Sequence, residues 1–208
     1  LKVTNPGGTD KVESYNGTAF TEVADIPAGK LSLAAAGTQP AGLAFGGEPE
    51  TADTQTWNGS GWTEVNNLNV AKRGNNVGGG SGSAISAGGY TNTNLNETEL
   101  WNGNSWTEVA DLNLGRDYAG GTGTSTEFLF YGGINPPAGS PTGATEIYNG
   151  TSWTEINDMS TARSYMYSGS ATGSAEAGLA VGSSPRAVGS EEFTAPSTFT
   201  KINLGQVY

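Results

Sequence analysis

The 208-residue sequence contains neither cysteine nor histidine. Disulfide bonds, thiolate nucleophiles and imidazole bases are therefore excluded, together with the commonest protein ligands of zinc and copper. We accordingly expect no metal site and no cofactor. A chain without cysteine suits oxidising and reducing surroundings alike, so cysteine usage leaves the compartment open.

Basic residues are also scarce. Nine Lys and Arg stand against 20 Asp and Glu, which gives a formal net charge of −11. A field of this sign repels phosphate backbones and anionic lipid surfaces, so nucleic acid is not an expected partner. No apolar run approaches the length of a membrane span, and we expect no membrane insertion. Because the chain opens at Leu1 without a charged segment leading into an apolar one, we interpret it as a processed or excised piece of a longer protein.

Glycine, by contrast, is abundant. The chain has 33 glycines, while only 14% of its residues are charged and 35% are hydrophobic. This composition differs from that of a helix-rich enzyme and from that of a highly charged disordered tail. It is typical of many short strands joined by Gly, Asn and Thr turns, and the length fits one all-β domain.

A repeated aromatic-Asn-Gly triplet organises the chain. It begins at Tyr15, Trp57, Trp101 and Tyr148, in steps of 42, 44 and 47 residues. Five residues after each aromatic comes a second one followed by Thr-Glu, and a weaker fifth copy covers residues 193–199. Asn-Gly between runs of aromatic and β-branched residues predicts a hairpin with a two-residue type I′ loop.

The hairpin predicts how its side chains divide between the two faces of a sheet. With a two-residue loop, Trp101 pairs with Asn104, and the indoles of Trp101 and Trp106 share one face. Leu100 and Val109 then occupy the other face. A sheet that is apolar on both faces needs cover on each side, which the neighbouring blades of a β-propeller supply. We therefore expect the aromatic pairs to form an inter-blade core and not a sugar-stacking array.

A second unit precedes each hairpin. It runs from a basic residue through an Ala- and Gly-rich stretch to an apolar run that ends in a glycine pair or, in the last copy, Gly-Ser; its basic residues are Lys30, Arg73, Arg116 and Arg163. The two units together make four strands in 42 to 47 residues, the spacing of propeller repeats. Over nearly the whole chain this order resembles the kelch repeat. The resemblance implies an all-β, kelch-type β-propeller with four-stranded blades.

Counting the units gives the number of blades. Five hairpins accompany four upstream units, because residues 1–8 read as a second strand with its glycine pair and no first strand ahead of it. Residues 203–208 echo residues 113–118, which lead into a first strand elsewhere. We therefore expect a single domain of five blades in which the C-terminal strand completes the N-terminal blade. The expected blades are residues 1–25 with 203–208, 26–67, 68–111, 112–158 and 159–202.

The candidate binding surface lies at one end of this scaffold. The variable connections between second and third strands, at residues 48–53, 90–97, 134–144 and 183–189, should emerge at the end where the basic residues begin the inner strands. An aromatic ring and amide groups in these loops suit a sugar, although solvated loops without a ligand are the plainer interpretation. The candidate ligand-binding residues are Tyr90, Asn92, Asn94, Asn135, Lys30, Arg73, Arg116 and Arg163.

The basic residues have two interpretations. Together they could bind an anion at the channel mouth, or each could pair with a carboxylate or a backbone carbonyl of an adjacent blade. The recurring acidic residues of the outermost strands look like solvated edge charges that discourage strand addition; they are Glu22, Glu64, Glu108 and Glu155.

No catalytic residues stand out, because the carboxylates fall at repeat-equivalent or loop positions without a unique pair, and we expect a protein that is not an enzyme. The repeats resemble in sequence the kelch-like arrays of virion structural and tail-fibre proteins of marine bacteriophages. The resemblance lies in residues 146–155, 157–158 and 161–163, and in residues 41–47. This resemblance implies a virion structural or appendage module, at the virion surface or extracellular, with other virion proteins or copies of itself as partners. Host attachment through surface glycans is a second role, and a bacterial secreted or cell-surface glycan-binding adhesin is the alternative.

Overall fold

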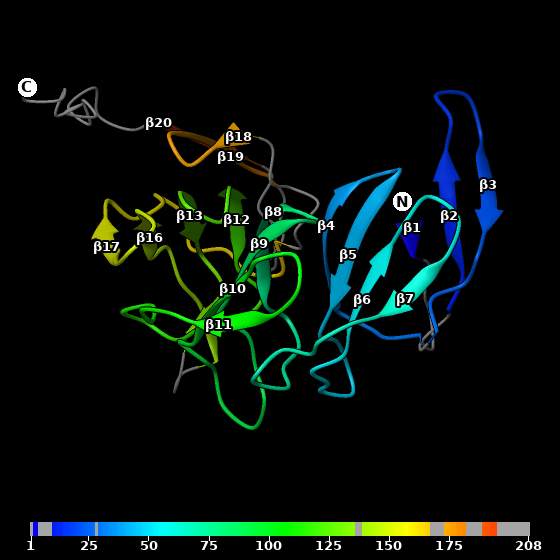
Figure 1. Cartoon of the computed structure of the whole chain (residues 1–208). Coiled ribbons are helices and arrows are strands. Elements are labelled where there is room, and N and C mark those ends of the chain that lie inside the picture. The colour runs from blue at the N-terminus through cyan, green and yellow to red at the C-terminus, as the bar shows by residue number, and fades with distance from the viewer. Residues whose placement is uncertain are drawn as a thin grey trace, which may run out of the picture.

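The computed structural model describes residues 2–3, 10–27, 29–135, 139–166, 173–181 and 189–194, and this part of the chain is all-β (Figure 1). The strands form antiparallel sheets of consecutive or nearly consecutive strands. No helix long and apolar enough to cross a membrane occurs in these ranges.

Three complete four-stranded sheets occupy the middle of the chain, one for each of three sequence repeats. The first contains β4 (Ala34–Thr38), β5 (Ala41–Phe45), β6 (Thr54–Trp57) and β7 (Trp62–Glu64). The second contains β8 (Asn76–Gly80), β9 (Ser83–Ala87), β10 (Thr98–Trp101) and β11 (Trp106–Glu108). The third contains β12 (Gly120–Gly123), β13 (Phe128–Tyr131), β16 (Thr145–Tyr148) and β17 (Trp153–Ile156). The predicted four-stranded sheets are confirmed for these repeats.

A three-stranded sheet stands at each end of the described chain. The N-terminal sheet contains β1 (Lys2–Val3), β2 (Val12–Tyr15) and β3 (Phe20–Val23). The last sheet contains β18 (Gly173–Ser174), β19 (Ala177–Val181) and β20 (Ser190–Thr194). A short ribbon of β14 (Ile134–Asn135) and β15 (Ser140–Pro141) lies in the long loop of the third middle sheet. Residues 203–208, which the sequence predicts to complete the N-terminal blade, lie outside the described residues.

The Asn-Gly hairpins form as predicted, but their loops have four residues instead of two. Trp101 pairs with Trp106 and not with Asn104. The side-chain oxygen of Asn102 accepts hydrogen bonds from the backbone N–H groups of Asn104 and Ser105, each at 2.9 Å. A type I′ turn requires positive φ at both central residues, whereas here only the glycine adopts it. The register is shifted by two residues, so both indoles still share one face.

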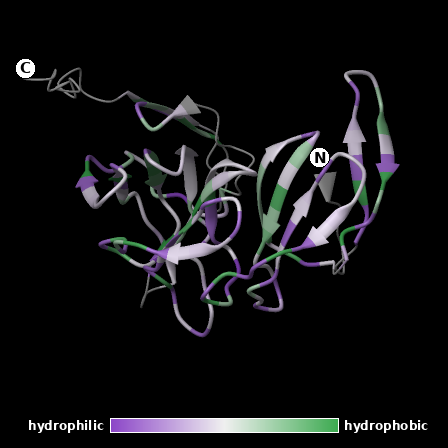
Figure 2. Ribbon diagram, in the orientation of Figure 1, coloured by the Kyte–Doolittle hydropathy of each residue, from purple (hydrophilic) through white to green (hydrophobic). Residues whose placement is uncertain are grey.

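Consecutive sheets stack face to face, with their first strands side by side. Strand β4 lies against β8, β8 against β12, and β12 against β18. Four apolar clusters fill the interfaces between the five larger sheets, and the second strand of each middle sheet, such as β5, is markedly hydrophobic (Figure 2). The aromatic pair of each middle sheet turns toward the preceding sheet: Trp106, for example, meets Phe45 edge-on at 4.6 Å between ring centroids. Both faces of the middle sheets are therefore covered, as the sequence predicts.

The five larger sheets follow one another in a fan that does not close (Figure 1). The N-terminal sheet and the last sheet lie on the two sides of the opening. The burial of the aromatic pairs follows this arrangement, because Trp101, Trp106, Tyr148 and Trp153 are buried between sheets while the pair of the N-terminal sheet is exposed.

Candidate functional site at the loop end of the sheets

The structure corrects the repeat alignment of one basic residue. Lys30, Lys72, Arg116 and Arg163 each follow, by four residues, an apolar residue that packs into an inter-sheet cluster. The equivalent of Arg116 is thus Lys72 and not its neighbour Arg73. The sequence alone could have shown this, because the spacing from the apolar residue is constant whereas the spacing from the glycine pair is not.

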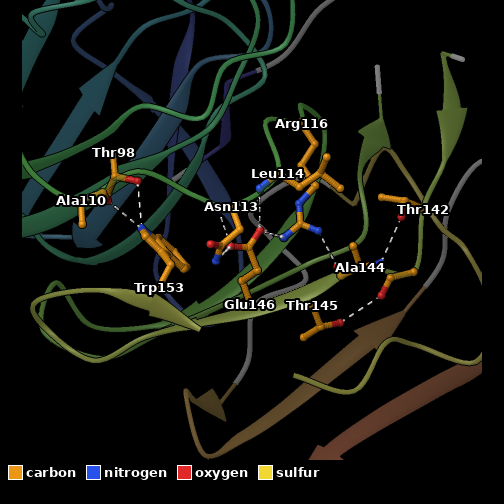
Figure 3. Close-up of polar contacts among 11 residues, drawn as sticks. Thr98, Ala110, Asn113, Leu114, Arg116, Thr142, Ala144, Thr145, Glu146 and Trp153 are labelled. Carbon is orange, nitrogen blue, oxygen red and sulfur yellow. Dashed lines mark hydrogen bonds and ion pairs between the residues drawn. The ribbon is translucent and has the colours of Figure 1, made fainter. Parts of the chain in front are cut away.

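Arg116 lies in a buried clasp formed with Glu146 (Figure 3). Its guanidinium donates to Glu146 Oε1 at 3.0 Å and to the Ala144 carbonyl at 2.6 Å. The other carboxylate oxygen accepts from the backbone and side-chain N–H groups of Asn113, at 2.7 and 2.8 Å. Burial lowers the pKa of Arg116 to about 10, against the opposing effect of Glu146, so the guanidinium remains charged at neutral pH. The clasp fixes the connection into β12 to the third strand of the same sheet.

The same clasp recurs in the neighbouring repeats. Lys72 Nζ lies 3.1 Å from Glu99, whose carboxylate also accepts from the backbone and side chain of Asn69. Arg163 lies 3.1 Å from Glu191. Burial lowers the pKa of Lys72, and the charge of Glu99 opposes this effect.

The sheet β4–β7 departs from this pattern. Gln55 stands where the other middle sheets have glutamate, and Lys30 instead lies 3.7 Å from Asp53. This Lys30 pair is partly exposed.

The prediction that the basic residues pair with carboxylates or carbonyls is confirmed for all four of them. The partners lie in an adjacent blade only for Arg73, which pairs with Glu48 and Glu50. For Lys30, Arg116 and Arg163 the assignment to an adjacent blade is wrong. Glu146 and Glu191 lie on the third strand of the sheet that each basic residue precedes. The third strands turn these side chains to the same face as their aromatic residue, which puts the clasp inside the interface with the preceding sheet. Since the guanidinium groups of Arg116 and Arg163 are buried and engaged there, the structure does not place them with the exposed loop residues.

Arg73, Tyr90 and Asn94, by contrast, belong to a single cluster at the loop end. Arg73 forms ion pairs with Glu48 at 2.8 Å and Glu50 at 3.0 Å, and its guanidinium lies 4.9 Å from the centre of the Tyr90 ring. Backbone hydrogen bonds in both directions join Arg73 to Tyr90. Asn94 bridges onward, because its amide donates to the Asp117 carboxylate at 2.9 Å. Arg73 is thus largely occupied by carboxylates of the preceding sheet's loop.

Asp117 is the most perturbed acid of this cluster. Burial raises its pKa to about 6, although the hydrogen bond from Asn94 and the charge of Arg73 act in the opposite direction. Asn135 lies half-buried on the neighbouring ribbon, and Asn92 is exposed on the loop that carries Tyr90.

A row of left-handed residues runs across the first-strand ends beside this cluster. Each of these residues stands two positions after one of the repeated basic residues Lys30, Lys72, Arg116 and Arg163, and each has a φ between 49° and 61°. They are Ser32, Gly74, Tyr118 and Tyr165. Tyr118 N–H donates to the Gly74 carbonyl at 2.9 Å, and Gly74 N–H to the Ser32 carbonyl at 3.4 Å. The tyrosines stack at 4.5 Å between centroids with 23° between the rings, and Arg73 donates to the Tyr118 hydroxyl at 3.4 Å. Bulky residues rarely adopt positive φ, so the tyrosines mark this end of the molecule. The tyrosines are not among the candidate residues predicted from the sequence, although their shared spacing from Arg116 and Arg163 is a signal that could have identified them.

Arg73, Tyr90 and Asn94 line none of three cavities found among the described residues, the smallest of which, about 10 Å³, lies beside Lys30 and Asp53. One of about 220 Å³ is lined by β4 and β5 together with Trp57 and Trp62, and one of about 90 Å³ lies between β13 and β20. Both adjoin an interface with a three-stranded end sheet, so they look like gaps in the repeated packing. The described ranges also bring together no group of three or more acidic residues that could hold a metal ion.

Comparison with known proteins adds no family: no model of a known protein family matches the sequence, and no curated protein matches it.

Proposed function

We propose that the chain is a non-catalytic, five-bladed kelch-like β-propeller that acts as a virion structural or appendage module and presents its loop end to other particle proteins or to the host surface. The observation that carries this proposal is the repetition of one apolar interface between consecutive sheets. A repeated interface with aligned first strands suits a rigid carrier of variable loops. In this proposal residues 203–208 complete the N-terminal blade.

The buried charges support a scaffold role. Lys72 and Arg116 reach carboxylates that also accept backbone N–H groups from the connecting segments. By accepting these N–H groups, the carboxylates of Glu99 and Glu146 hold the connecting segments in register with the third strands. Their position inside the sheet interfaces leaves the loop end to make external contacts.

The experiment is a structure of the native particle or appendage that contains this chain. The proposal expects density for the sheets at the particle surface, with either end of the stack against neighbouring copies or other particle proteins. A loop end buried against those proteins identifies a structural module, and a loop end directed outward identifies host recognition. Absence of the chain from purified particles would refute the virion role.

The alternative is a bacterial secreted or cell-surface module that binds glycans. The stacked tyrosines favour it, because Tyr165 is 42% exposed and offers a ring face beside the half-buried Tyr118. A glycan array tests it with the natural chain, with Tyr165→Ala, and with Tyr15→Ala as a control for an exposed aromatic elsewhere. Binding that only Tyr165→Ala abolishes supports the alternative, whereas an array without hits removes it.

A further inference from the structure

The cavity of about 220 Å³ lies on the face of the sheet β4–β7 that turns toward the N-terminal sheet. Its lining is mostly apolar, with Trp57 and Trp62 on one side and small residues of β4 and β5, such as Ala35 and Gly42, on the other. Gly42 pairs with Trp57 and Trp57 with Trp62, so these three positions share one face of the sheet. Ala35 is exposed at the rim, so a solute can enter without unfolding the sheet.

The repeat shows what fills the corresponding space in another sheet. Phe128 of β13 occupies the position of Gly42, because each stands four residues before a glycine pair and pairs with the first aromatic of its hairpin. The Phe128 ring is fully buried and meets Trp153 edge-on at 6.3 Å between ring centroids. It lies over Gly121, where an added Cβ would overlap the ring, and Ala35 is the equivalent second residue of β4. The cavity is therefore the space that a phenyl ring occupies when this position is not glycine.

The volume and the lining select a class of ligand. An apolar cavity of roughly 150 Å³ is enough to bind benzene, so about 220 Å³ holds one six-membered ring with a short substituent. The indole N–H groups are engaged, because Trp57 donates to the Gln39 carbonyl at 2.8 Å and Trp62 donates to the Ala24 carbonyl at 3.2 Å. The indoles thus offer ring surface, against which the hydroxyl groups of a sugar would lose hydrogen bonds to water. The polar side chains of the lining, Thr38 and Gln39, lie together at the β4–β5 turn.

We propose that this cavity binds a small aromatic molecule: a single planar ring with at most a short polar substituent. The ring would pack against Ala35 and Gly42 with its edge toward Trp62, as the Phe128 ring does toward Trp153, and the substituent would lie toward Thr38. Every lining residue belongs to the sheet β4–β7 or to its β4–β5 turn. The site is therefore separate from the loop end, and it does not depend on how the end sheets are arranged.

Saturation-transfer NMR on the whole chain tests the proposal, with benzyl alcohol as the probe and methyl glucoside as the polar comparison. Gly42→Phe introduces the ring that β13 carries at this position and fills the cavity. Because a Cβ at Gly42 would lie 3.3 Å from the Trp57 Cβ and could disturb folding, Ala35→Phe blocks the same cavity from its exposed rim. The matched control is Gly82→Phe, in an exposed turn of another sheet where an added Cβ meets nothing within 4 Å. Circular dichroism checks that each variant folds.

The expected result is saturable binding of benzyl alcohol to the natural chain and to Gly82→Phe, weakened at least about ten-fold in Gly42→Phe and in Ala35→Phe. Absence of saturable binding to the natural chain would overturn the proposal. Binding that neither cavity variant weakens would also overturn it, since the probe would then lie elsewhere. Tighter binding of methyl glucoside than of benzyl alcohol would replace the aromatic ligand by a sugar. None of these measurements involves particles or host cells, so failure here is distinct from failure of the proposed function.

Discussion

The sheet β8–β11 and the N-terminal sheet β1–β3 contain the same hairpin in different surroundings. In both, the two aromatics are paired across the strands, with ring centroids 5.4 Å apart for Trp101 and Trp106 and 4.9 Å apart for Tyr15 and Phe20. The first pair is buried against the preceding sheet and the second is exposed. Local sequence therefore determines the hairpin, while a neighbouring sheet determines whether its aromatic face contributes to a core.

The largest effect should come from truncating the buried member of this comparison. Trp101→Ala is expected to lower the free energy of unfolding by about 3–5 kcal/mol, because it removes a buried indole and leaves a cavity in the interface. Urea denaturation measures the change. Tyr15→Ala is the matched variant: because Tyr15 is 47% exposed, its truncation is expected to change the free energy of unfolding by less than about 0.5 kcal/mol. A loss below about 1 kcal/mol for Trp101→Ala would contradict the packing described above.

The buried clasp gives the second comparison. Glu146→Gln leaves the Arg116 guanidinium buried without a counter-charge and is expected to destabilise the protein by about 3–5 kcal/mol. Glu13 occupies the equivalent position in the N-terminal sheet and is half-exposed, so Glu13→Gln should change stability by less than about 0.5 kcal/mol. Denaturation of both variants in one buffer provides the measurement. Equal losses would show that the two sheets experience the same environment.

The third comparison concerns Asp117, a buried acid whose carboxylate accepts a hydrogen bond from the neutral amide of Asn94, whereas Glu146 is paired with a guanidinium. Its folded pKa of about 6 lies above the ordinary value of 3.8, so the protonated form is favoured in the folded state. The contribution of Asp117 to the free energy of unfolding is therefore fully present below about pH 4, and it is lost as the pH rises to about 6.

Asp117→Asn should remove this loss. At 1.36 kcal/mol per pKa unit, the variant is expected to be more stable than the natural chain at pH 7 by at most about 3 kcal/mol, and not more stable at pH 4. Thermal or urea unfolding across this pH range, with the exposed Asp111→Asn as control, tests the sign. A variant that is less stable at pH 7 would show that the carboxylate is favourably bound.

Much of this organisation could be predicted from the sequence, because it depends on local spacing. The Asn-Gly hairpins, the two-faced apolar pattern and the burial of Trp101 all follow from the repeat. The loop length was wrong because the Asn102 side chain stabilises a four-residue loop that a dipeptide rule does not include. The partner of Arg116 was placed in the wrong sheet, although strand alternation puts Glu146 on the face of Tyr148, because the sequence does not show that the segment before β12 folds back against the third strand of its own sheet.

The candidate site was less predictable. Tyr90 and Asn94 could be selected as loop residues, and they do lie with Arg73 in one cluster. Arg73 could not be distinguished from Lys72 by charge alone, although only Lys72 is fully buried. The spacing of Tyr118 and Tyr165 from Arg116 and Arg163 marks them as equivalent positions, but their stacking depends on left-handed backbone in two repeats, which the spacing does not reveal.

The smallest expected effect concerns the four-residue hairpin loop, which the sheet β8–β11 and the N-terminal sheet β1–β3 share. Asn102→Ala and Asn16→Ala each remove a side-chain oxygen that accepts two backbone N–H groups within the hairpin loop. Because these loops are exposed and alike, each substitution should cost about 1 kcal/mol, and the two losses should agree within about 0.5 kcal/mol. Urea denaturation of both variants measures the difference. Agreement would show that the loop acts locally, and that the contrast between Trp101 and Tyr15 arises from the neighbouring sheet alone. A much larger loss for Asn102 would mean that loop geometry also depends on the packed interface, and the hairpin could then no longer be treated as independent of its surroundings.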